Sequence, residues 1–203
     1  MSEPSSKREQ LRQERRQQIL EAALAVFGQK GFHAANVSDV AARAGVSQGT
    51  IYWYFDSKEE LLTAALLSYF ADFEKDMWSQ LQAQDSAAAT LRVLVGQMEA
   101  FASDATGLFP LFMEYWASSQ QRAESAQLWS GLLTEFKDVI AGVIQEGVDA
   151  GEFRPVDAEN LAWSMMAAYD GLAAYTLLLP DLDLAAASQA FIDALIAGLS
   201  AEV

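Results

Sequence analysis

The 203-residue chain contains no cysteine, a single histidine and only four prolines. Without cysteine there is neither a disulfide nor a thiolate metal site, and one imidazole does not make a cluster of histidine ligands. The N-terminus is polar and has no apolar segment of the signal-peptide kind, and apolar runs such as LAAYTLLL are too short to span a bilayer. We therefore expect a cytoplasmic protein with no metal site, no cofactor and no membrane partner.

Catalytic motifs are scarce as well. The sequence has no HExxH pattern and no phosphate-binding loop, and without cysteine it lacks that nucleophile. Two acids stand inside apolar runs, Glu114 in LFMEYW and Asp170 in AAYDGL. A buried acid has to be paired, protonated or matched to a cationic ligand, whereas an acid facing water or a partner subunit needs none of these. Two isolated carboxylates do not predict catalysis, so no catalytic residue and no enzyme is expected.

Positive charge is sparse and unevenly distributed. The chain carries 13 Lys and Arg against 28 Asp and Glu, a formal net charge of −15. Residues 1–58 hold eight of the basic residues and only six of the acidic ones. Because interactions between exposed charges fade over roughly 8–10 Å at physiological salt, a locally basic segment can bind an anionic partner although the whole chain is acidic. The overall charge does not exclude a nucleic-acid partner.

The stretch VSDVAARAGVSQGTIYWYF, residues 37–55, predicts two short helices joined by a tight turn. Asn36 is placed to cap the first helix together with Asp39, and Ser47 is placed to cap the second. Gly45 lies where a helix ends in a left-handed residue. This pattern fits an ordinary helical hairpin, and it also fits a helix-turn-helix whose second helix enters a DNA major groove.

Residues 15–62 contain three stretches that occur in the order ILEAALAVFGQKGF, VSDVAARAGVSQGTIYWYF and DSKEELL. Through these stretches, residues 15–62 resemble the DNA-binding domain of the TetR family of transcriptional regulators. Ala35 and Asn36 stand where the family often has threonines, and Gln48 where it often has a lysine. The resemblance implies an all-α fold of about nine helices. It places an N-terminal helix-turn-helix domain of three helices at residues 1–57 and a larger effector-binding and dimerisation domain at residues 58–203.

Helix periodicity and the positions of Gly and Pro predict where the remaining helices lie. Residues 1–7 are polar and are expected to be disordered. Gly142 and Gly147 fall inside a long helical pattern and indicate either a kink or close packing. The predicted helices outside the 37–55 stretch are 8–30, 58–84, 86–104, 109–119, 124–150, 157–179 and 184–200.

A homodimer bound to a double-stranded DNA operator of pseudo-palindromic sequence is what the resemblance implies. Glutamine reads adenine well and glycine permits close approach of the backbone, so Gln48 and Gly49 are expected near base edges. A cation at a helix N-terminus opposes the helix dipole and suits a bound anion, which places Lys58 at a phosphate. The expected DNA-binding residues are Arg16, Asn36, Ser47, Gln48, Gly49, Thr50, Tyr52, Trp53 and Lys58.

The first helix carries Arg8, Arg12, Arg15 and Arg16 in its early turns. Two interpretations fit this run: a solvated basic face and a phosphate-contacting face. Only Arg16 is included in the predicted DNA-binding set above.

The second domain is rich in methionine and aromatic residues, which fits either a plain core or an adaptable apolar pocket between helices. By resemblance, this domain binds a small-molecule effector, for which we expect a flat, hydrophobic or aromatic compound, with a positive charge as one option. The expected effector-binding residues are Met98, Phe101, Phe112, Met113, Trp116, Trp129, Phe136, Met166 and Tyr169.

Apolar residues recur at three- and four-residue steps on the last two helices. Such stripes fit packing inside one subunit, and they also fit a four-helix bundle across a two-fold axis, which the resemblance favours. The expected dimer residues are Leu161, Met165, Ala168, Leu172, Tyr175, Phe191 and Leu195.

The leading interpretation is thus a transcriptional regulator, most simply a repressor that a small hydrophobic effector releases from DNA. The alternative is a helical adaptor that binds proteins and has no sequence-specific affinity for DNA. An adaptor explains the acidic second domain and the helical stripes, but it leaves the helix-turn-helix pattern unexplained.

Overall fold

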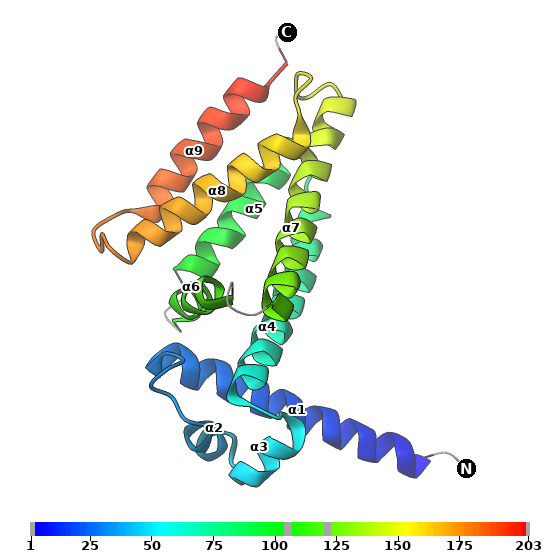
Figure 1. The fold of residues 1–203 in the computed structure, drawn as a ribbon. Coiled ribbons are helices and arrows are strands. Elements are labelled where there is room, and N and C mark those ends of the chain that lie inside the picture. Colours follow the sequence, from blue (N-terminus) through cyan, green and yellow to red (C-terminus); the bar gives the residue numbers. More distant parts are fainter. Residues whose placement is uncertain (1–2, 104–106, 120–122, 202–203) are drawn as a thin grey trace. The chain divides into compact units, whose positions relative to one another are not determined.

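The computed structural model describes residues 3–103, 107–119 and 123–201, and within these ranges the chain forms nine α-helices and no strand longer than an isolated bridge (Figure 1). The all-α prediction is confirmed. None of the helices in these ranges is long and apolar enough to cross a membrane. The helices are α1 Glu3–Lys30, α2 Val37–Ala44, α3 Gln48–Tyr54, α4 Lys58–Leu81, α5 Ala87–Ala102, α6 Leu108–Ser119, α7 Ala123–Asp149, α8 Ala158–Thr176 and α9 Leu184–Leu199.

The prediction of a disordered N-terminal segment is wrong. Residues 3–7, expected to be disordered, belong to α1, which begins at Glu3. Pro4 suits the first turn of a helix, where a backbone N–H has no intrahelical partner, and from Lys7 onward the sequence is rich in Arg, Glu and Gln, which favour a helix. Residues 1 and 2 lie outside the described residues.

The chain divides into two compact units, and each of them draws on two segments of the sequence. Unit 1 comprises Met1–Glu74 and Ala105–Tyr115, and unit 2 comprises Lys75–Asp104 and Trp116–Val203. The helices α4 and α6 each contribute residues to both units. The predicted functional division after residue 57 therefore falls inside unit 1, and it stays a prediction.

Unit 1 holds the helix-turn-helix around a small apolar core. The helix α1 contributes Ile19 and Phe27, α2 contributes Val40, and α3 contributes Ile51, and all four side chains are buried. The Gln18 side chain donates a hydrogen bond of 3.0 Å to the Ala44 carbonyl oxygen, which ties α1 to the end of α2. Burial of these apolar faces positions α2 and α3 against α1 and leaves the opposite face of α3 open.

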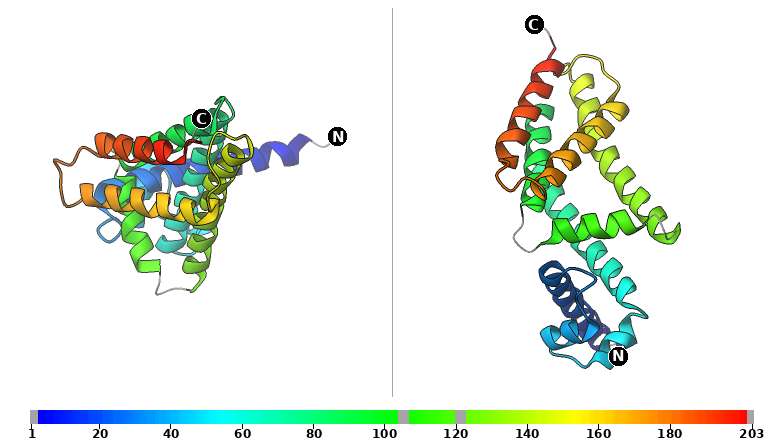
Figure 2. Two further views of the ribbon diagram at one scale, coloured as in Figure 1. Left: turned by 90° about the horizontal axis from the view of Figure 1, so that it is seen from above. Right: turned by 60° about the vertical axis from the view of Figure 1, so that its left-hand side comes forward.

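Unit 2 consists mainly of α5, α7, α8 and α9, together with the ends of α4 and α6, and α9 packs on both α5 and α8 (Figure 2). Its core includes Leu94 of α5, Ile144 of α7 and Ile192 of α9. Of the two alternatives predicted for Gly142 and Gly147, a kink or close packing, the second holds at Gly147, because a Cβ atom there would overlap the Phe153 ring, whereas the space around Gly142 is open. The glycine thus allows the chain after α7 to fold back closely.

Candidate nucleic-acid interface and ligand site

Local hydrogen bonds define the α2–turn–α3 motif at the predicted positions. The Asn36 backbone N–H donates to the Asp39 carboxylate over 3.0 Å, and the Ser47 Oγ accepts a bond of 3.0 Å from the Thr50 N–H. Gly45 is left-handed with φ 63°, and the following Val46 N–H donates to the Ala41 carbonyl. These bonds satisfy one free N–H at the start of α3 and one free carbonyl at the end of α2, and they fix the turn between the helices.

The open face of α3 is polar and aromatic. Gln48 and Gly49 are exposed at its N-terminal end, Tyr52 is 49% exposed and Trp53 is 64% exposed, while Ile51 faces the core. No Lys, Arg, Asp or Glu occurs between Gln48 and Tyr54. This face offers hydrogen-bonding groups and flat rings to a partner, and it supplies no formal charge.

Two basic side chains lie near the residues that follow α3. Lys58 is the first residue of α4, and its Nζ lies 4.4 Å from the centre of the Phe32 ring. The Arg16 guanidinium carbon lies 5.5 Å from the centre of the Phe55 ring, just after the end of α3. A cation over an aromatic face is favourable, so the Phe32 ring offsets the unfavourable position of Lys58 at a helix N-terminus.

Ser57 caps α4. The Glu60 N–H donates to the Ser57 Oγ over 3.0 Å, and the Glu60 carboxylate accepts from the Asp56 N–H. The carboxylate therefore reaches one residue beyond the cap. The result is a rigid start to α4 next to the end of α3.

Opposite charges also fix the first helix of the motif. The Lys30 ammonium lies 2.9 Å from Asp39, and together with the Asn36 N–H it holds the pKa of Asp39 below its ordinary value. The carboxylate thus stays ionised at the N-terminus of α2, where the helix dipole favours a negative charge.

Glu114, one of the two acids found inside apolar runs, contacts the loop between α1 and α2. Its carboxylate accepts a bond of 3.4 Å from the Phe32 N–H and lies 3.3 Å from the His33 Nε2. The neighbouring Tyr115 hydroxyl hydrogen-bonds to Thr63 of α4. These contacts join α6 to the helix-turn-helix within unit 1, and sequence reasoning missed them because 82 residues separate Phe32 from Glu114.

The second acid belongs to a buried polar corner in unit 2. Burial raises the pKa of Asp170 to about 6, and burial also raises the pKa of the adjacent Tyr169, with Glu99 and Asp170 adding to the effect. The Tyr169 side chain is 5% exposed, and its hydroxyl has no hydrogen-bond partner among the described residues. The two carboxylates thus act electrostatically on the Tyr169 hydroxyl, and a negative charge of this kind favours a cation nearby.

The structure divides the predicted effector residues between the two units. Phe112 and Met113 lie on the part of α6 that belongs to unit 1, where the Phe112 ring centre is 5.7 Å from that of Phe70. The remaining residues belong to unit 2, and apart from Trp116 of α6 they come from α5, α7 and α8, which pack against one another. These unit 2 residues are Met98, Phe101, Trp116, Trp129, Phe136, Met166 and Tyr169.

The predicted dimer residues lie on α8 and α9 with differing exposure. Met165 is buried within unit 2 at 4% exposed, whereas Tyr175 is 55% exposed. An open groove of about 390 Å³ runs between the two helices, and Leu161 and Leu195 line it. The half-buried members of the set are Leu161, Ala168, Leu172, Phe191 and Leu195.

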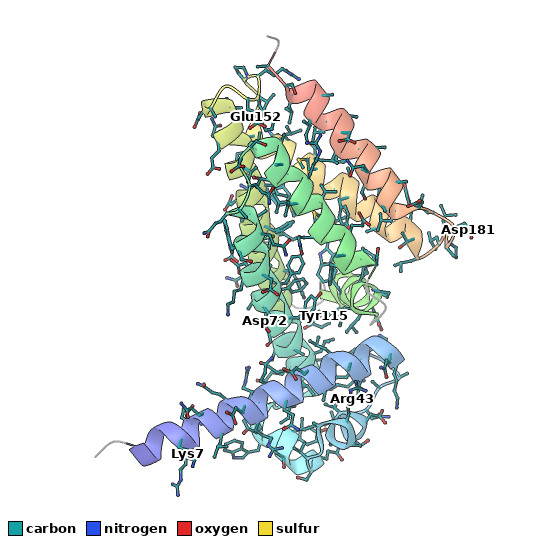
Figure 3. The ribbon with its side chains drawn as sticks, turned by 180° about the vertical axis from the view of Figure 1, so that it is seen from behind. Lys7, Arg43, Asp72, Tyr115, Glu152 and Asp181 are labelled. Atoms are coloured by element: carbon teal, nitrogen blue, oxygen red, sulfur yellow. The ribbon has the colours of Figure 1, made fainter. Side chains whose placement is uncertain are left out.

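Apolar exposure continues beyond the predicted residues. Trp163 on α8 is exposed, and so are Leu177, Leu178 and Leu179 after its end. The loop that follows, which includes Asp181, projects from one end of α8 and α9 (Figure 3). Large exposed apolar side chains, when contiguous, commonly mark an interaction surface, and three of these four are consecutive in the chain.

Two family profiles match the chain. The profile described as bacterial regulatory proteins of the tetR family matches residues 19–65, and the profile described as the C-terminal part of BetI-type transcriptional repressors matches residues 87–201. The "Fatty acid metabolism regulator protein" of Bacillus subtilis (strain 168) is 26% identical over 185 residues, which cover 90% of this chain and 94% of the relative.

Two solved structures share the fold. A transcriptional regulator from Saccharomonospora viridis in complex with choline superposes with a TM-score of 0.83 at 24% identity, covering 94% of this chain and all of the other. The regulator FadR from Bacillus subtilis in complex with stearoyl-CoA gives a TM-score of 0.69 at 24% identity, covering 90% of this chain and 98% of the other. At this identity the likeness concerns the fold.

Proposed function

The chain belongs to the tetR family of bacterial regulatory proteins and carries the C-terminal domain of BetI-type transcriptional repressors. From this membership we propose that it is a ligand-responsive repressor that binds a pseudo-palindromic operator as a homodimer. The observation that carries the DNA-binding part is the exposed polar and aromatic face of α3, held by capped ends on the core of unit 1. Gln48 and Gly49 lie at the N-terminal end of α3, which is the end that reads base edges in a helix-turn-helix.

In this proposal Gln48 reads an adenine through two hydrogen bonds, while Thr50, Tyr52 and Lys58 contact phosphates and fix the register. Ser47 and Asn36 stand at the helix N-termini, where backbone N–H groups favour an anion. Each good base contact contributes about 1–3 kcal/mol of discrimination, and phosphate contacts add affinity for any sequence.

Substitution of Gln48 tests the role of α3. A genomic fragment selected by the wild-type protein should bind Gln48→Ala about 5- to 150-fold less tightly, because alanine cannot form two hydrogen bonds to the base. Binding to unrelated DNA should change little. The control is Gln82→Ala, an exposed glutamine after α4. Equal affinity of Gln48→Ala and wild type for the selected fragment would contradict the proposed reading helix.

The proposed effector is an apolar cation that binds in unit 2 near Tyr169. Tyr169 offers an aromatic ring and a hydroxyl without a hydrogen-bond partner among the described residues, and Glu99 and Asp170 supply negative charge next to it. Aromatic rings with nearby carboxylates attract quaternary ammonium groups, and the Saccharomonospora viridis regulator holds choline. The Bacillus subtilis regulator holds stearoyl-CoA, an acyl thioester whose phosphates carry negative charge, so the alternative effector is an acyl compound of the opposite charge.

Thermal shift measurements distinguish these two classes. Choline or a related quaternary ammonium compound should raise the melting temperature of the wild-type protein, and Asp170→Asn should reduce that rise. The rise should also be larger at pH 7.5 than at pH 5, because the Asp170 carboxylate is ionised mainly above its pKa of about 6. The exposed Asp181→Asn serves as control. Stabilisation by stearoyl-CoA and not by choline would replace the cation with an acyl effector.

Release from DNA follows if the effector prefers a conformation in which the two helix-turn-helix units are wrongly spaced for the operator. Binding linkage requires this effect to be reciprocal, so operator DNA must weaken effector binding by the same factor by which the effector weakens DNA binding. Isothermal titration of the effector with and without operator measures that factor directly.

A further inference from the structure

The N-terminal half of α1 is a basic helical arm that the proposed function does not yet use. Every side chain from Lys7 to Arg16 is exposed, and Lys7 lies near the free end of α1 (Figure 3). Five of these ten residues are Lys or Arg, against two Glu. We define residues 7–16 as the basic arm.

Three arginines of the basic arm share one face of the helix. Arg8, Arg12 and Arg15 follow one another at steps of four and three residues, and the next residue at this spacing is Ile19, which is fully buried. The face of α1 that packs on the core of unit 1 therefore continues as an arginine-rich face beyond that core. Glu14 does not share this face, because it lies one residue away from Arg15 around the helix.

Contacts within unit 1 join the arm to the end of α3. The Arg12 guanidinium carbon lies 4.9 Å from the centre of the Trp53 ring, and the Tyr54 hydroxyl donates a bond of 3.3 Å to the Arg12 carbonyl oxygen. Arg16 lies over Phe55, the residue that ends α3. Three consecutive residues of the chain, 53 to 55, thus hold the arm in a fixed direction relative to α3.

Electrostatics explain why such an arm would matter. Affinity for double-stranded DNA depends strongly on Lys and Arg that neutralise phosphates, and α3 itself has none. Lys30 is already paired with Asp39. The arm places a row of arginines beside the exposed Trp53, and from Arg12 the helix continues for nine residues, or about 13 Å, to Glu3.

We propose that the basic arm is a second DNA-binding element, which contacts phosphates flanking the groove entered by α3 and is anchored to α3 through Arg12 and Trp53. This inference rests on the proposed function, since it requires that α3 bind DNA. The basic arm would contact DNA outside the base pairs that α3 reads. The affinity of the protein for its operator should therefore depend on the DNA that flanks the operator core.

The test compares two duplexes that carry the same selected operator, one trimmed to the operator core and one extended by about one helical turn, roughly 10 base pairs, on each side. Fluorescence anisotropy gives both affinities at several salt concentrations. The wild-type protein should bind the extended duplex several-fold more tightly, and this ratio isolates the arm because both duplexes present the same bases to α3.

Arg8→Gln should lower the ratio toward one and should flatten the log–log salt slope on the extended duplex by about 0.9 for each phosphate that the arm no longer neutralises. Trp53→Ala should also lower the ratio, because the arm then has no anchor on α3, whatever the substitution does to affinity for the core. Lys75→Gln, which removes one exposed charge from α4 outside unit 1, is the matched control and should leave ratio and slope unchanged.

A wild-type ratio of one, or a ratio and slope that Arg8→Gln leaves unchanged, would overturn the role of the arm while specific binding by α3 remains. Loss of operator preference in Gln48→Ala together with such a result would show that the proposed function stands without the arm. A wild-type protein that shows no preference for any DNA fragment would overturn both proposals.

Discussion

At the scale of single residues, two left-handed glycines differ in what surrounds them. Gly45 has φ 63° with open space where a side chain would start, whereas Gly107 has φ 77° and a Cβ atom there would overlap the Gly28 carbonyl oxygen. A backbone atom cannot rotate away as a flexible side chain can. The cost of a side chain is therefore conformational at Gly45 and both conformational and steric at Gly107.

Alanine substitution should separate the two costs. Gly45→Ala should lower the free energy of unfolding by about 1–2 kcal/mol, the usual cost of a left-handed residue with a side chain. Gly107→Ala should lower it by more than that. Urea denaturation followed by circular dichroism measures both values, and equal losses would contradict the close approach of Gly107 to Gly28.

Asp170 makes stability depend on pH. Because its pKa is raised from 3.8 to about 6 in the folded protein, the ionised carboxylate opposes folding above pH 6, and this penalty fades as the pH falls toward 4. Asp170→Asn should raise the free energy of unfolding by roughly 1–3 kcal/mol at pH 7.5 and change it little at pH 4. Urea denaturation at the two pH values measures this, and the same effect at both would contradict burial of the carboxylate.

The sequence predicted the roles of single residues correctly where the interacting groups lie within a few positions of each other in the chain. The roles of Asn36, Gly45 and Ser47 in ending and starting helices follow from neighbours no more than five residues away. The contact of Glu114 with His33 and Phe32 depends on packing between α6 and a loop far away in sequence. No local pattern encodes such a pair.

At the scale of elements, α5 begins with an unusually complete cap. The Glu152 carboxylate, from the loop between α7 and α8, accepts bonds of 2.8 and 2.9 Å from the Ala87 and Ala88 N–H groups, and Ser86 accepts one from Ala89. A negative charge also complements the helix dipole there. This single side chain joins two elements that are distant in sequence.

Glu152→Gln should lower the free energy of unfolding by about 1–2 kcal/mol, because the amide keeps one acceptor and removes the charge. Chemical denaturation at neutral pH measures the change. Glu146→Gln, an exposed residue of α7, makes the same charge change outside the cap and should have little effect. Similar losses in the two variants would show that the cap contributes nothing beyond net charge.

Element boundaries show where sequence periodicity stops being informative. The predicted helix 157–179 ends as α8 at Thr176, because Leu177 and Leu178 turn back with hydrogen bonds to Ala174 and Tyr175. Leucine favours a helix as well as it fills a turn, and only the proline at 180 signals a break nearby. The exposure of these leucines could therefore not be predicted from periodicity, which places them inside a helix.

At the scale of the whole molecule, substitutions on α8 and α9 test the proposed homodimer interface. Phe191→Glu or Leu172→Glu would place an unpaired charge in the proposed α8–α9 interface and should convert a dimer into a monomer. Light scattering coupled to size-exclusion chromatography measures the mass. Gln82→Glu adds the same charge elsewhere and should remain dimeric. A monomeric wild-type protein, or dimeric Phe191→Glu and Leu172→Glu variants, would contradict this interface.

Sequence patterns predicted the helical class of the molecule and the order of its helices, because the periodicity of each helix is a local property. These patterns could not predict the division into compact units. The helices α4 and α6 each contribute residues to both units, and only tertiary contacts determine where one unit ends. The predicted effector set was divided for the same reason, with Phe112 and Met113 in unit 1.

Sequence-specific DNA binding through α3 can be measured by selecting genomic fragments with the purified protein and sequencing them. We predict enrichment of fragments that contain an inverted repeat, with half-site centres separated by one helical turn, roughly 34–36 Å, or a multiple of it. We also predict that Gln48→Ala no longer enriches them. Fragments recovered without a shared repeat, or recovered equally by Gln48→Ala, would contradict the claim.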